Sequence, residues 1–342
     1  MGIYITKTKT IHEIAKLANV SIGTVSRVVN DRPNVKPDTR KRVKDIVEKF
    51  GYRPSAMARG LQRRRTDAIM LIVSDIADLY YPRLIKYLNS RCREAGLHLI
   101  LGCSDWNPKV EAGYLRQVMD GFVDGLIISP ASTNHQNAAL FMDIAAHKFP
   151  VVTIENECPG ASFPTILYDD AGGARSAVVA LARQGHKRIG YCACNIQVGT
   201  VRRRYEGYLE GHRAEGLVAA QELSLTDSAG IDAWDFDALI RLLHSKQPPT
   251  AILTQNDFMA LRIMFHLEKA GIKVPKDLAV VGYGDIYPAE LLKQQLSSVA
   301  VPWRELCDAS LSLLRQQISH IGRQVPFTPQ MLMPSFKAGS TS

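Results

Sequence analysis

The hydrophobic pattern of the chain changes near residue 66. Before that point, apolar residues recur every three or four positions, which is the spacing of one face of an amphipathic helix. After it, short runs of consecutive apolar residues alternate with longer amphipathic stretches. The pattern therefore predicts a small all-α unit followed by a larger α/β unit.

Three short helices are predicted in the first unit. Thr10 opens a capping-box pattern, so a helix begins directly after it. Ser21 is a good N-cap for a second helix, which runs to about Asn30. Pro37 begins a third helix, which Gly51 ends. Two short helices joined by a tight turn and braced by a third are typical of a helix-turn-helix, whose second helix enters the major groove of DNA.

Seven apolar runs after Asp67 are predicted to be buried parallel strands. They cover residues 68–73, 97–102, 125–129, 151–155, 188–193, 251–255 and 278–283. Amphipathic helices are predicted between them, at 82–95, 110–119, 173–183 and 258–270. This alternation favours a doubly wound α/β unit with two similar lobes. Ligands bind such sheets beyond the carboxyl ends of the strands, so residues that follow each run are candidates for a binding site.

The positive charge of the chain is concentrated at one end. Residues 1–65 hold 16 Lys and Arg against 5 Asp and Glu, whereas the other 277 residues hold 26 against 28, and the whole chain carries a net charge of +9. A polyanion is the natural partner of such a field. The alternative is a helical bundle with a solvated basic face. That alternative does not explain why the exposed face of the second helix is small and polar with one arginine, so we interpret the first unit as DNA-binding.

Composition excludes a membrane protein. No run of eighteen apolar residues is present, and the first residues lack the apolar segment of a secretory signal, so we expect a cytoplasmic protein. The six cysteines form no CxxC pair, which favours buried thiols in a reducing compartment and no metal site.

A competing class is an α/β sugar-metabolising enzyme with a basic N-terminal extension. None of the motifs GxGxxG after a strand, GxxxxGK[ST], HExxH and GxSxG occurs in the chain. His186 is a candidate base, but it lies in a helix-to-strand connection, at the end of the sheet opposite to binding sites. We therefore expect no enzyme activity, no catalytic residue and no cofactor.

The strings VSIGTVSRVVN and GYRPSAMARGL resemble the lac repressor (LacI/GalR-type) family of bacterial transcriptional regulators, in order and spacing. By position, Ile22 and Gly23 fall where the family reads operator bases, and Arg27 falls on its base-contacting arginine. The resemblance implies a set of DNA-binding residues: Thr10, Ser21, Ile22, Gly23, Thr24, Ser26, Arg27, Asn30, Tyr52, Ala58 and Leu61. Two positions depart from the family pattern. Gly23 offers no side chain, and Lys36 stands where the family has a serine or threonine cap for the third helix.

Residues 53–62 resemble the hinge helix of the family. A segment this short is not stable as a helix on its own, so we expect it to be helical only when two copies pack together on DNA. In the family, the residue at Leu61 wedges into the minor groove and kinks the duplex. A flexible linker is the alternative. The implied domains are a helix-turn-helix domain at 1–53, a hinge helix and linker at 54–66, and an effector-binding and dimerisation domain at 67–342.

The strings FVDGLIISP, QGHKRIGYC and GIKVPKDLAVVGYGD resemble the effector domain of the family, which is related to periplasmic sugar-binding proteins. The implied fold class is an all-α helix-turn-helix headpiece plus a two-lobed α/β domain like the type I periplasmic binding proteins. The resemblance places the N-lobe at about 67–167 and 300–328. It places the C-lobe at about 168–299 and 329–342, with the effector in the cleft between the lobes.

The resemblance also implies effector-binding residues: Asp78, Tyr80, Tyr81, Glu155, Arg204, Phe236, Asn256 and Asp285. Carboxylates, amides, a guanidinium and aromatic rings suit a sugar. Gly284 takes the place of a usual aspartate, and Arg204 ends a run of three arginines, so we hypothesise a sugar acid or sugar phosphate. A neutral sugar remains open.

Together, the residues and the resemblance predict a repressor of carbohydrate-utilisation genes. It would bind double-stranded DNA at a palindromic operator as a homodimer, with its affinity controlled by a small-molecule effector, in the nucleoid of a bacterial cytoplasm. A tetramer is also possible, although the residues after Pro334 lack a heptad pattern.

Overall fold

The computed structural model describes residues 9–52, 65–131, 136–158, 160–194, 196, 198–226, 233–286, 294–320 and 327–342. The chain divides into two compact units, Met1–Thr66 and Asp67–Ser342. The predicted hinge helix, with Ala58 and Leu61, lies outside the described residues.

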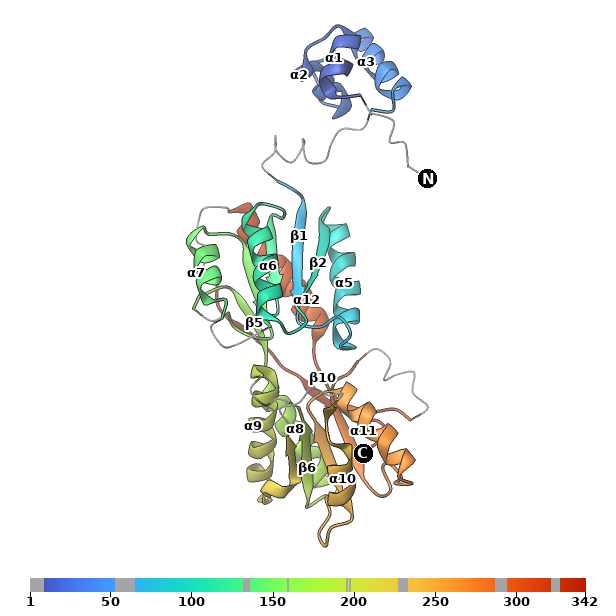
Figure 1. Ribbon diagram of the computed structural model, residues 1–342, viewed down its shortest axis with the longest axis vertical. Coiled ribbons are helices and arrows are strands. Elements are labelled where there is room, and N and C mark those ends of the chain that lie inside the picture. The colour runs from blue at the N-terminus through green and yellow to red at the C-terminus, as the bar shows by residue number, and fades with distance from the viewer. Residues whose placement is uncertain are drawn as a thin grey trace. The chain divides into compact units, whose positions relative to one another are not determined.

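The first unit contains the three predicted helices: α1 (Ile11–Ala18), α2 (Ile22–Val29) and α3 (Pro37–Lys49) (Figure 1). They share one small core, to which α1 and α2 contribute most of the buried residues: Ile14, Ala15, Ala18, Val25, Val28 and Val43. The apolar periodicity predicted this packing, because residues three and four apart lie on one helix face. Asn19 ends α1 in the left-handed conformation and starts the turn into α2.

The second unit contains two six-stranded sheets. The first has the order β11-β5-β4-β3-β1-β2, with β1 (Ala68–Val73), β2 (His98–Cys103), β3 (Gly125–Ile128), β4 (Val151–Ile154), β5 (Thr165–Tyr168) and β11 (Gln330–Leu332). The second has the order β12-β10-β9-β8-β6-β7, with β6 (Ile189–Ala193), β7 (Ser224–Thr226), β8 (Ala251–Thr254), β9 (Ala279–Gly284), β10 (Ser297–Ala300) and β12 (Ser335–Lys337). Only the β10–β12 pair is antiparallel among the pairs described.

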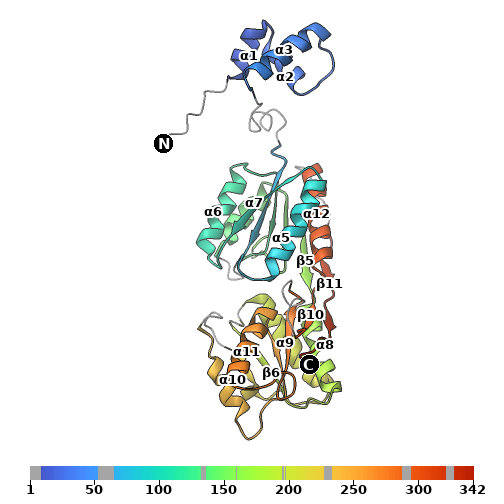
Figure 2. The same ribbon diagram turned by 90° about the vertical axis from the view of Figure 1, so that its right-hand side faces the viewer.

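Helices cover both faces of each sheet (Figure 2). On the first sheet, α6 (Pro108–Met119) and α7 (Ala138–Ala146) lie on one face, and α5 (Tyr80–Glu94) and α12 (Trp303–Ser319) lie on the other. On the second sheet, α10 (Phe236–Leu243) and α11 (Asp257–Lys269) lie opposite α8 (Asp170–Arg183) and α9 (Gly199–Ala214). The predicted α/β architecture with two similar lobes is confirmed.

Strand β1 illustrates why its sequence is a continuous apolar run. Ile69, Leu71 and Val73 belong to the core under α5 and α12, whereas Met70 and Ile72 belong to the core under α6 and α7. Successive side chains of a strand point to opposite faces, so a strand covered on both faces is apolar throughout.

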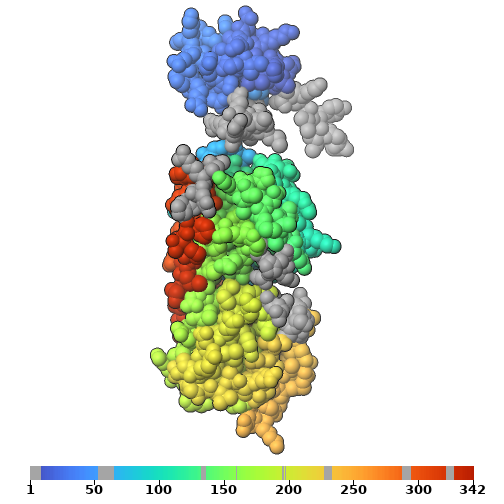
Figure 3. Space-filling model, turned by 90° about the vertical axis from the view of Figure 1, so that its left-hand side faces the viewer, coloured from blue at the N-terminus to red at the C-terminus, as the bar shows by residue number. Residues whose placement is uncertain are grey.

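The chain crosses between the two lobes three times. It leaves the first sheet after β5 and returns to the first lobe after β10, into α12. The last crossing lies between β11 and β12, because Met331 pairs with Leu167 while Phe336 pairs with Val299. The return to the second lobe therefore falls after Leu332, close to the expected boundary at about residue 329. In the space-filling view the C-terminal residues, in red, run along the side of the first lobe (Figure 3).

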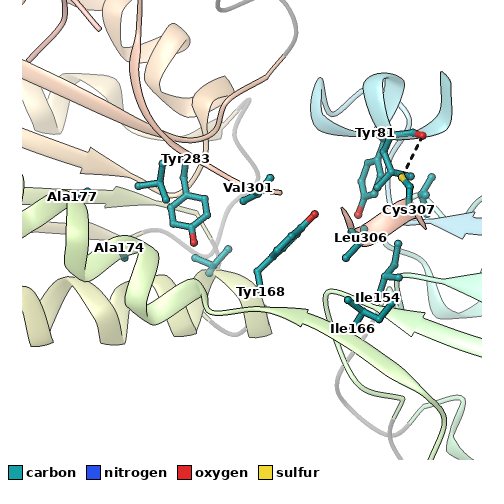
Figure 4. Packing of buried hydrophobic residues seen from close by; sticks show 14 of the residues in the cluster. Tyr81, Ile154, Ile166, Tyr168, Ala174, Ala177, Tyr283, Val301, Leu306 and Cys307 are labelled. Carbon is teal, nitrogen blue, oxygen red and sulfur yellow. Dashed lines mark hydrogen bonds between the residues drawn. The ribbon is translucent and has the colours of Figure 1, made fainter. Parts of the chain in front are cut away.

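One apolar core continues from lobe to lobe at the crossings. Tyr168, at the end of β5, lies between Tyr283 and Val301 on one side and the first-lobe residues around Leu306 on the other (Figure 4). All six cysteines are free thiols, and only Cys103 is not buried. Cys192 and Cys194 share one core, as the alternation of a strand predicts.

The structure corrects one strand prediction. Strand β2 is at the edge of its sheet and is not buried, since Ile100 and Leu101 are 38% and 41% exposed. Apolar content predicted the strand correctly but not its position in the sheet. Among the described residues, no helix is long and apolar enough to cross a membrane.

Candidate DNA interface and effector site

The start of α2 is held by its N-cap. Ser21 Oγ accepts a hydrogen bond from the Thr24 amide at 3.1 Å and lies 3.0 Å from Thr24 Oγ1. These bonds satisfy an amide that the first turn would otherwise leave unpaired. Ser21 and Thr24, both predicted to contact DNA, therefore also fix the position of the helix that carries the other predicted contacts.

The outer face of α2 carries Ile22, Gly23 and Arg27. Ile22 is 39% exposed, and Arg27 is exposed with no hydrogen bond or ion pair to any described side chain. A Cβ built on Gly23 would have only Ser21 Oγ within 4 Å, at 3.7 Å. Internal packing therefore does not require a glycine at this position.

The other predicted DNA-binding residues of the first unit make structural contacts. The Thr10 amide donates to Glu13 Oε2 at 2.7 Å, and the Glu13 amide donates to Thr10 Oγ1, which completes the predicted capping box. The backbone bond from Thr10 and the Lys9 ammonium lower the pKa of Glu13 to about 2. Asn30 ends α2 and donates to the Ser26 carbonyl at 2.8 Å. The Tyr52 ring packs against the core of the unit.

In the first lobe, a polar cluster lies at the carboxyl ends of β3 and β4. Tyr81 Oη donates to Glu155 Oε2 at 3.0 Å and is 3.4 Å from Ser129 Oγ. Glu155 is 7% exposed and has a left-handed backbone, with φ of 64°. Burial raises the pKa of Glu155, while hydrogen bonds from Ser129 and Tyr81 partly offset that effect. The Glu155 carboxylate is already buried and hydrogen-bonded, so a polar ligand that bound here would not have to remove water from it.

Asp78 and Tyr80 lie beside this cluster. Tyr80 Oη is 2.9 Å from Tyr168 Oη, so the two rings meet where β5 ends. Asp78 Oδ1 accepts from the Tyr80 amide at 3.0 Å, and burial raises the pKa of Asp78. The predicted first-lobe residues therefore form one connected set.

In the second lobe, Arg204 is not free to clamp a ligand with its full guanidinium. Its Nε donates to Asp170 Oδ1 at 2.9 Å, and its Nη1 donates to the Gln255 carbonyl at 2.7 Å. The guanidinium also lies 3.9 Å over the ring of Tyr283. Asp170 is fully buried, and its Oδ2 also accepts a hydrogen bond from Arg203 Nη2 at 2.9 Å. Sequence reasoning missed Asp170, because it is 34 residues away from Arg204 and gives no motif.

Phe236 and Asn256 also have partners within the lobe. The Phe236 ring stacks on His266, with centroids 4.0 Å apart, and is 8% exposed. Asn256 Oδ1 caps α11 by accepting from the Met259 amide at 2.9 Å. The neighbouring Asp257 is fully buried, and burial raises its pKa to about 6.

Asp285 does not point its carboxylate at the other predicted effector residues. Lys337 Nζ lies 3.2 Å from Asp285 Oδ1, on β12 of the same lobe. The Asp285 backbone is left-handed, with φ of 54°, and its carbonyl accepts a hydrogen bond from Arg83 at 2.6 Å. The structure thus brings Asp285 to the contact between the lobes.

Two further buried polar residues lie beside the polar cluster of the first lobe: Asn156, which stands at a family position often taken by an arginine, and Ser129, which was not singled out from the sequence. Asn156 Oδ1 is buried without a hydrogen-bond partner among the described residues, and Asn156 follows Glu155 directly. Ser129 follows β3 in the same way. The position of Ser129 directly after a strand is the signal that could have identified it. The described residues contain no group of three or more potential metal ligands.

A helix-turn-helix unit and a two-lobed α/β fold in one chain define the class of DNA-binding transcriptional regulators. Comparisons with known protein families agree with that class. Residues 10–55 match the family "Bacterial regulatory proteins, lacI family", and residues 178–342 match "Periplasmic binding protein-like domain".

The relatives are transcriptional regulators and not enzymes, and the similarity extends over most of their length. HTH-type transcriptional regulator GalS of Salmonella typhimurium is 30% identical over 308 residues, which is 90% of this chain and 89% of that protein. Catabolite control protein A of Priestia megaterium is 29% identical over 311 residues, which is 91% of this chain and 92% of that protein. The chain belongs to the lacI family of bacterial regulatory proteins.

Solved structures share the fold. A lac repressor dimer bound to operator and the anti-inducer ONPF superposes with a TM-score of 0.82 at 23% identity, covering 98% of this chain and 99% of that chain. The transcriptional regulator CelR in complex with cellobiose gives a TM-score of 0.70 at 26% identity, covering 98% of this chain and 100% of that chain.

Proposed function

We propose that the protein is a repressor of carbohydrate-utilisation genes that binds a palindromic operator as a homodimer. The observation that carries the proposal is the outer face of α2, where Ile22, Gly23 and Arg27 are exposed on a helix fixed by Ser21. In this family fold, such a helix lies in the major groove and its first residues contact base edges. The protein then acts in the cytoplasm, where the DNA is.

The homodimer is supported by the exposed edge strand β2. Ile100 and Leu101 place apolar side chains in contact with solvent on an unpaired sheet edge, which a second copy would cover. The lac repressor that shares this fold was solved as a dimer on its operator. Two heads related by a two-fold axis read two half-sites in opposite orientation, so the operator is a palindrome.

Residues 54–66 act as the hinge in this proposal. Two hinge segments become helical together on DNA, and Leu61 inserts into the minor groove at the centre of the operator. The effector then acts by changing how the two hinges are held.

The effector proposed here is a neutral sugar. The sequence-based argument for an acidic sugar rested on Gly284, which stands where the family has an aspartate, and on Arg204 with its two arginine neighbours. Asp170 and two main-chain carbonyls occupy donors of Arg203 and Arg204, and the Asp170 carboxylate offsets one of the two positive charges, so fewer donors are left for an anionic ligand. The other polar groups of the site are carboxyls, phenols and the Asn156 amide, whose Oδ1 has no hydrogen-bond partner among the described residues, and these suit hydroxyl groups better than an anion.

The DNA-binding part is tested by selecting binding sequences from a random library with the full-length protein. A palindromic consensus is expected, and the Arg27→Ala variant is expected to lose preference at one base pair per half-site, at a cost of about 1–3 kcal/mol. Lys246→Ala, on the exposed end of the second lobe, is the matched control. An unchanged consensus with Arg27→Ala contradicts the assigned role of Arg27.

The effector part is tested by calorimetric titration with matched ligands: glucose, gluconate, glucose 6-phosphate and cellobiose. Binding of a neutral sugar, abolished by Asn156→Leu, supports the proposal. Binding of gluconate or glucose 6-phosphate in preference to both neutral sugars overturns the neutral class and restores the acidic one.

A further inference from the structure

The two lobes are joined by hydrogen bonds from one arginine of each lobe. Arg83, on α5 of the first lobe, donates from Nη1 to the carbonyl of Asp285 in the second lobe at 2.6 Å. Arg203, on α9 of the second lobe, donates from Nη2 to the carbonyl of Glu155 in the first lobe at 2.7 Å. The two contacts are reciprocal, because each lobe supplies one arginine and one carbonyl.

The two acceptors share an uncommon backbone. Glu155 follows β4 with φ of 64°, and Asp285 follows β9 with φ of 54°. Non-glycine residues adopt this left-handed region at an energetic cost, so it persists where the surroundings enforce it. Hydrogen bonds to neighbouring strands enforce it here, since the Glu155 amide donates to the Ile166 carbonyl on β5 and the Asp285 amide donates to Ser298 Oγ on β10. The residue after each strand therefore presents its carbonyl to the opposite lobe.

Each arginine is also anchored within its own lobe. The Arg83 guanidinium lies 4.7 Å over the ring of Trp303, at the start of α12. The Arg203 guanidinium binds the buried Asp170 carboxylate through Nε and Nη2, at 3.2 and 2.9 Å. Fixing the side chain beforehand reduces the entropy lost when it bonds to the other lobe. The adjacent Arg204 differs, because its carbonyl partner, Gln255, lies in its own lobe.

We propose that Arg83 and Arg203 form a pair of reciprocal latches that hold the two lobes in the arrangement described here without any ligand. Arg83 and Arg203 are positioning residues: they set the balance between this arrangement and an open one, on which a ligand then acts. The latches do not depend on which effector the protein binds or on the operator it reads.

The test measures the distance between the lobes in the full-length protein, without DNA or ligand. Spin labels are attached through a non-natural amino acid at exposed positions 116, on α6, and 246, after α10. Double electron–electron resonance then gives the distance distribution. One narrow distribution is expected for the unsubstituted chain, and a longer and broader one for the double variant Arg83→Met with Arg203→Met. Each single variant is expected to lie between them.

Arg91→Met is the matched control. Arg91 lies on the same helix as Arg83, but its partner Asp308 belongs to the same lobe, at 2.8 Å. This variant is expected to keep the narrow distribution. A folded double variant that also keeps it overturns the latches, and if the double variant does not fold, an unchanged distribution in both single variants has the same meaning. Because neither DNA nor effector is present, failure here leaves the proposed function untouched, and the reverse also holds.

Discussion

Gly23 lies on α2 at a position that is predicted to contact DNA, and glycine also lowers the stability of a helix. A Cβ would fit, since only Ser21 Oγ lies within 4 Å of it. Glycine in a helix costs about 0.5–1 kcal/mol relative to alanine. We therefore expect Gly23→Ala to stabilise α2 by up to about 1 kcal/mol, measured by amide hydrogen exchange of the full chain.

DNA affinity, measured by fluorescence anisotropy on the selected sequence, is expected to fall, because the methyl group occupies the space needed for close approach of the backbone to the bases. Stronger or equal DNA binding would show that α2 does not approach the bases at Gly23.

Asp257 gives the second lobe a pH-dependent stability. Burial raises its folded pKa from an ordinary value of 3.8 to about 6, although Ser298 Oγ and the Ile286 amide bond to the carboxylate. The folded state therefore favours the protonated carboxyl. The contribution of Asp257 to the unfolding free energy is fully present below the pKa of the unfolded state and is lost as the pH rises through the pKa of the folded state. The unfolding free energy of the unsubstituted chain, relative to Asp257→Asn, is expected to fall by roughly 2 kcal/mol between pH 4 and 7. Chemical denaturation at intervals of pH measures this difference, and a flat difference refutes it.

Single residues also mark the limit of sequence reasoning about the site. The family resemblance placed Tyr81 and Glu155 in one pocket, and the structure shows a hydrogen bond between their side chains. The partner of Arg204 could not be predicted, because Asp170 reaches it only through the packing of α8 against α9. Likewise, nothing in the amino-acid sequence indicates that Asp285 presents its carbonyl, rather than its carboxylate, to the other lobe.

Among the elements, the helices of the first unit begin in two different ways. Thr10 and Ser21 cap α1 and α2 with side-chain hydrogen bonds, whereas Lys36 makes no such bond at the start of α3. The backbone of Lys36, with φ of −54° and ψ of 140°, is suitable for a capping residue. We expect Lys36→Ser to stabilise α3 by about 1 kcal/mol. In the variant, slower hydrogen exchange of the first-turn amides of α3, with unchanged exchange in α1, would confirm this. First-turn amides that exchange as fast as in the unsubstituted chain would contradict it.

Elements with strong apolar periodicity were predictable, and short polar ones were not. The runs that became β1, β3, β4, β6, β8 and β9 are buried on both faces, so their sequences are almost entirely apolar, with one threonine each in β4 and β8. β7, β11 and β12 have three residues each and lie at sheet edges, where their sequences are not constrained to be apolar. β10 is SSVA, whose buried serines bond to neighbouring segments instead of filling an apolar core. No local pattern identifies such strands.

For the whole molecule, the separation of charge makes DNA binding depend on salt. Residues 1–65 have eleven more positive than negative side chains, and the rest of the chain is nearly neutral. Each phosphate neutralised by a lysine or arginine contributes about −0.9 to the slope of log affinity against log salt concentration. Arg64→Ala, in the basic tail, is expected to weaken binding to all sequences equally and to reduce that slope by about one. Lys246→Ala is expected to leave it unchanged. A slope that Arg64→Ala does not alter would remove this arginine from the phosphate contacts.

The three crossings between the lobes determine the order in which the protein can be completed during synthesis. The first lobe needs α12 and β11, so its sheet and its helical cover are incomplete until the ribosome has made Leu332. The second lobe also waits for β12, at Ser335–Lys337. The three-helix unit has no such dependence, because all its core residues are made first. A truncated chain from an interrupted message would thus carry a folded DNA-binding head and two unfinished lobes with exposed apolar faces, a target for proteolysis.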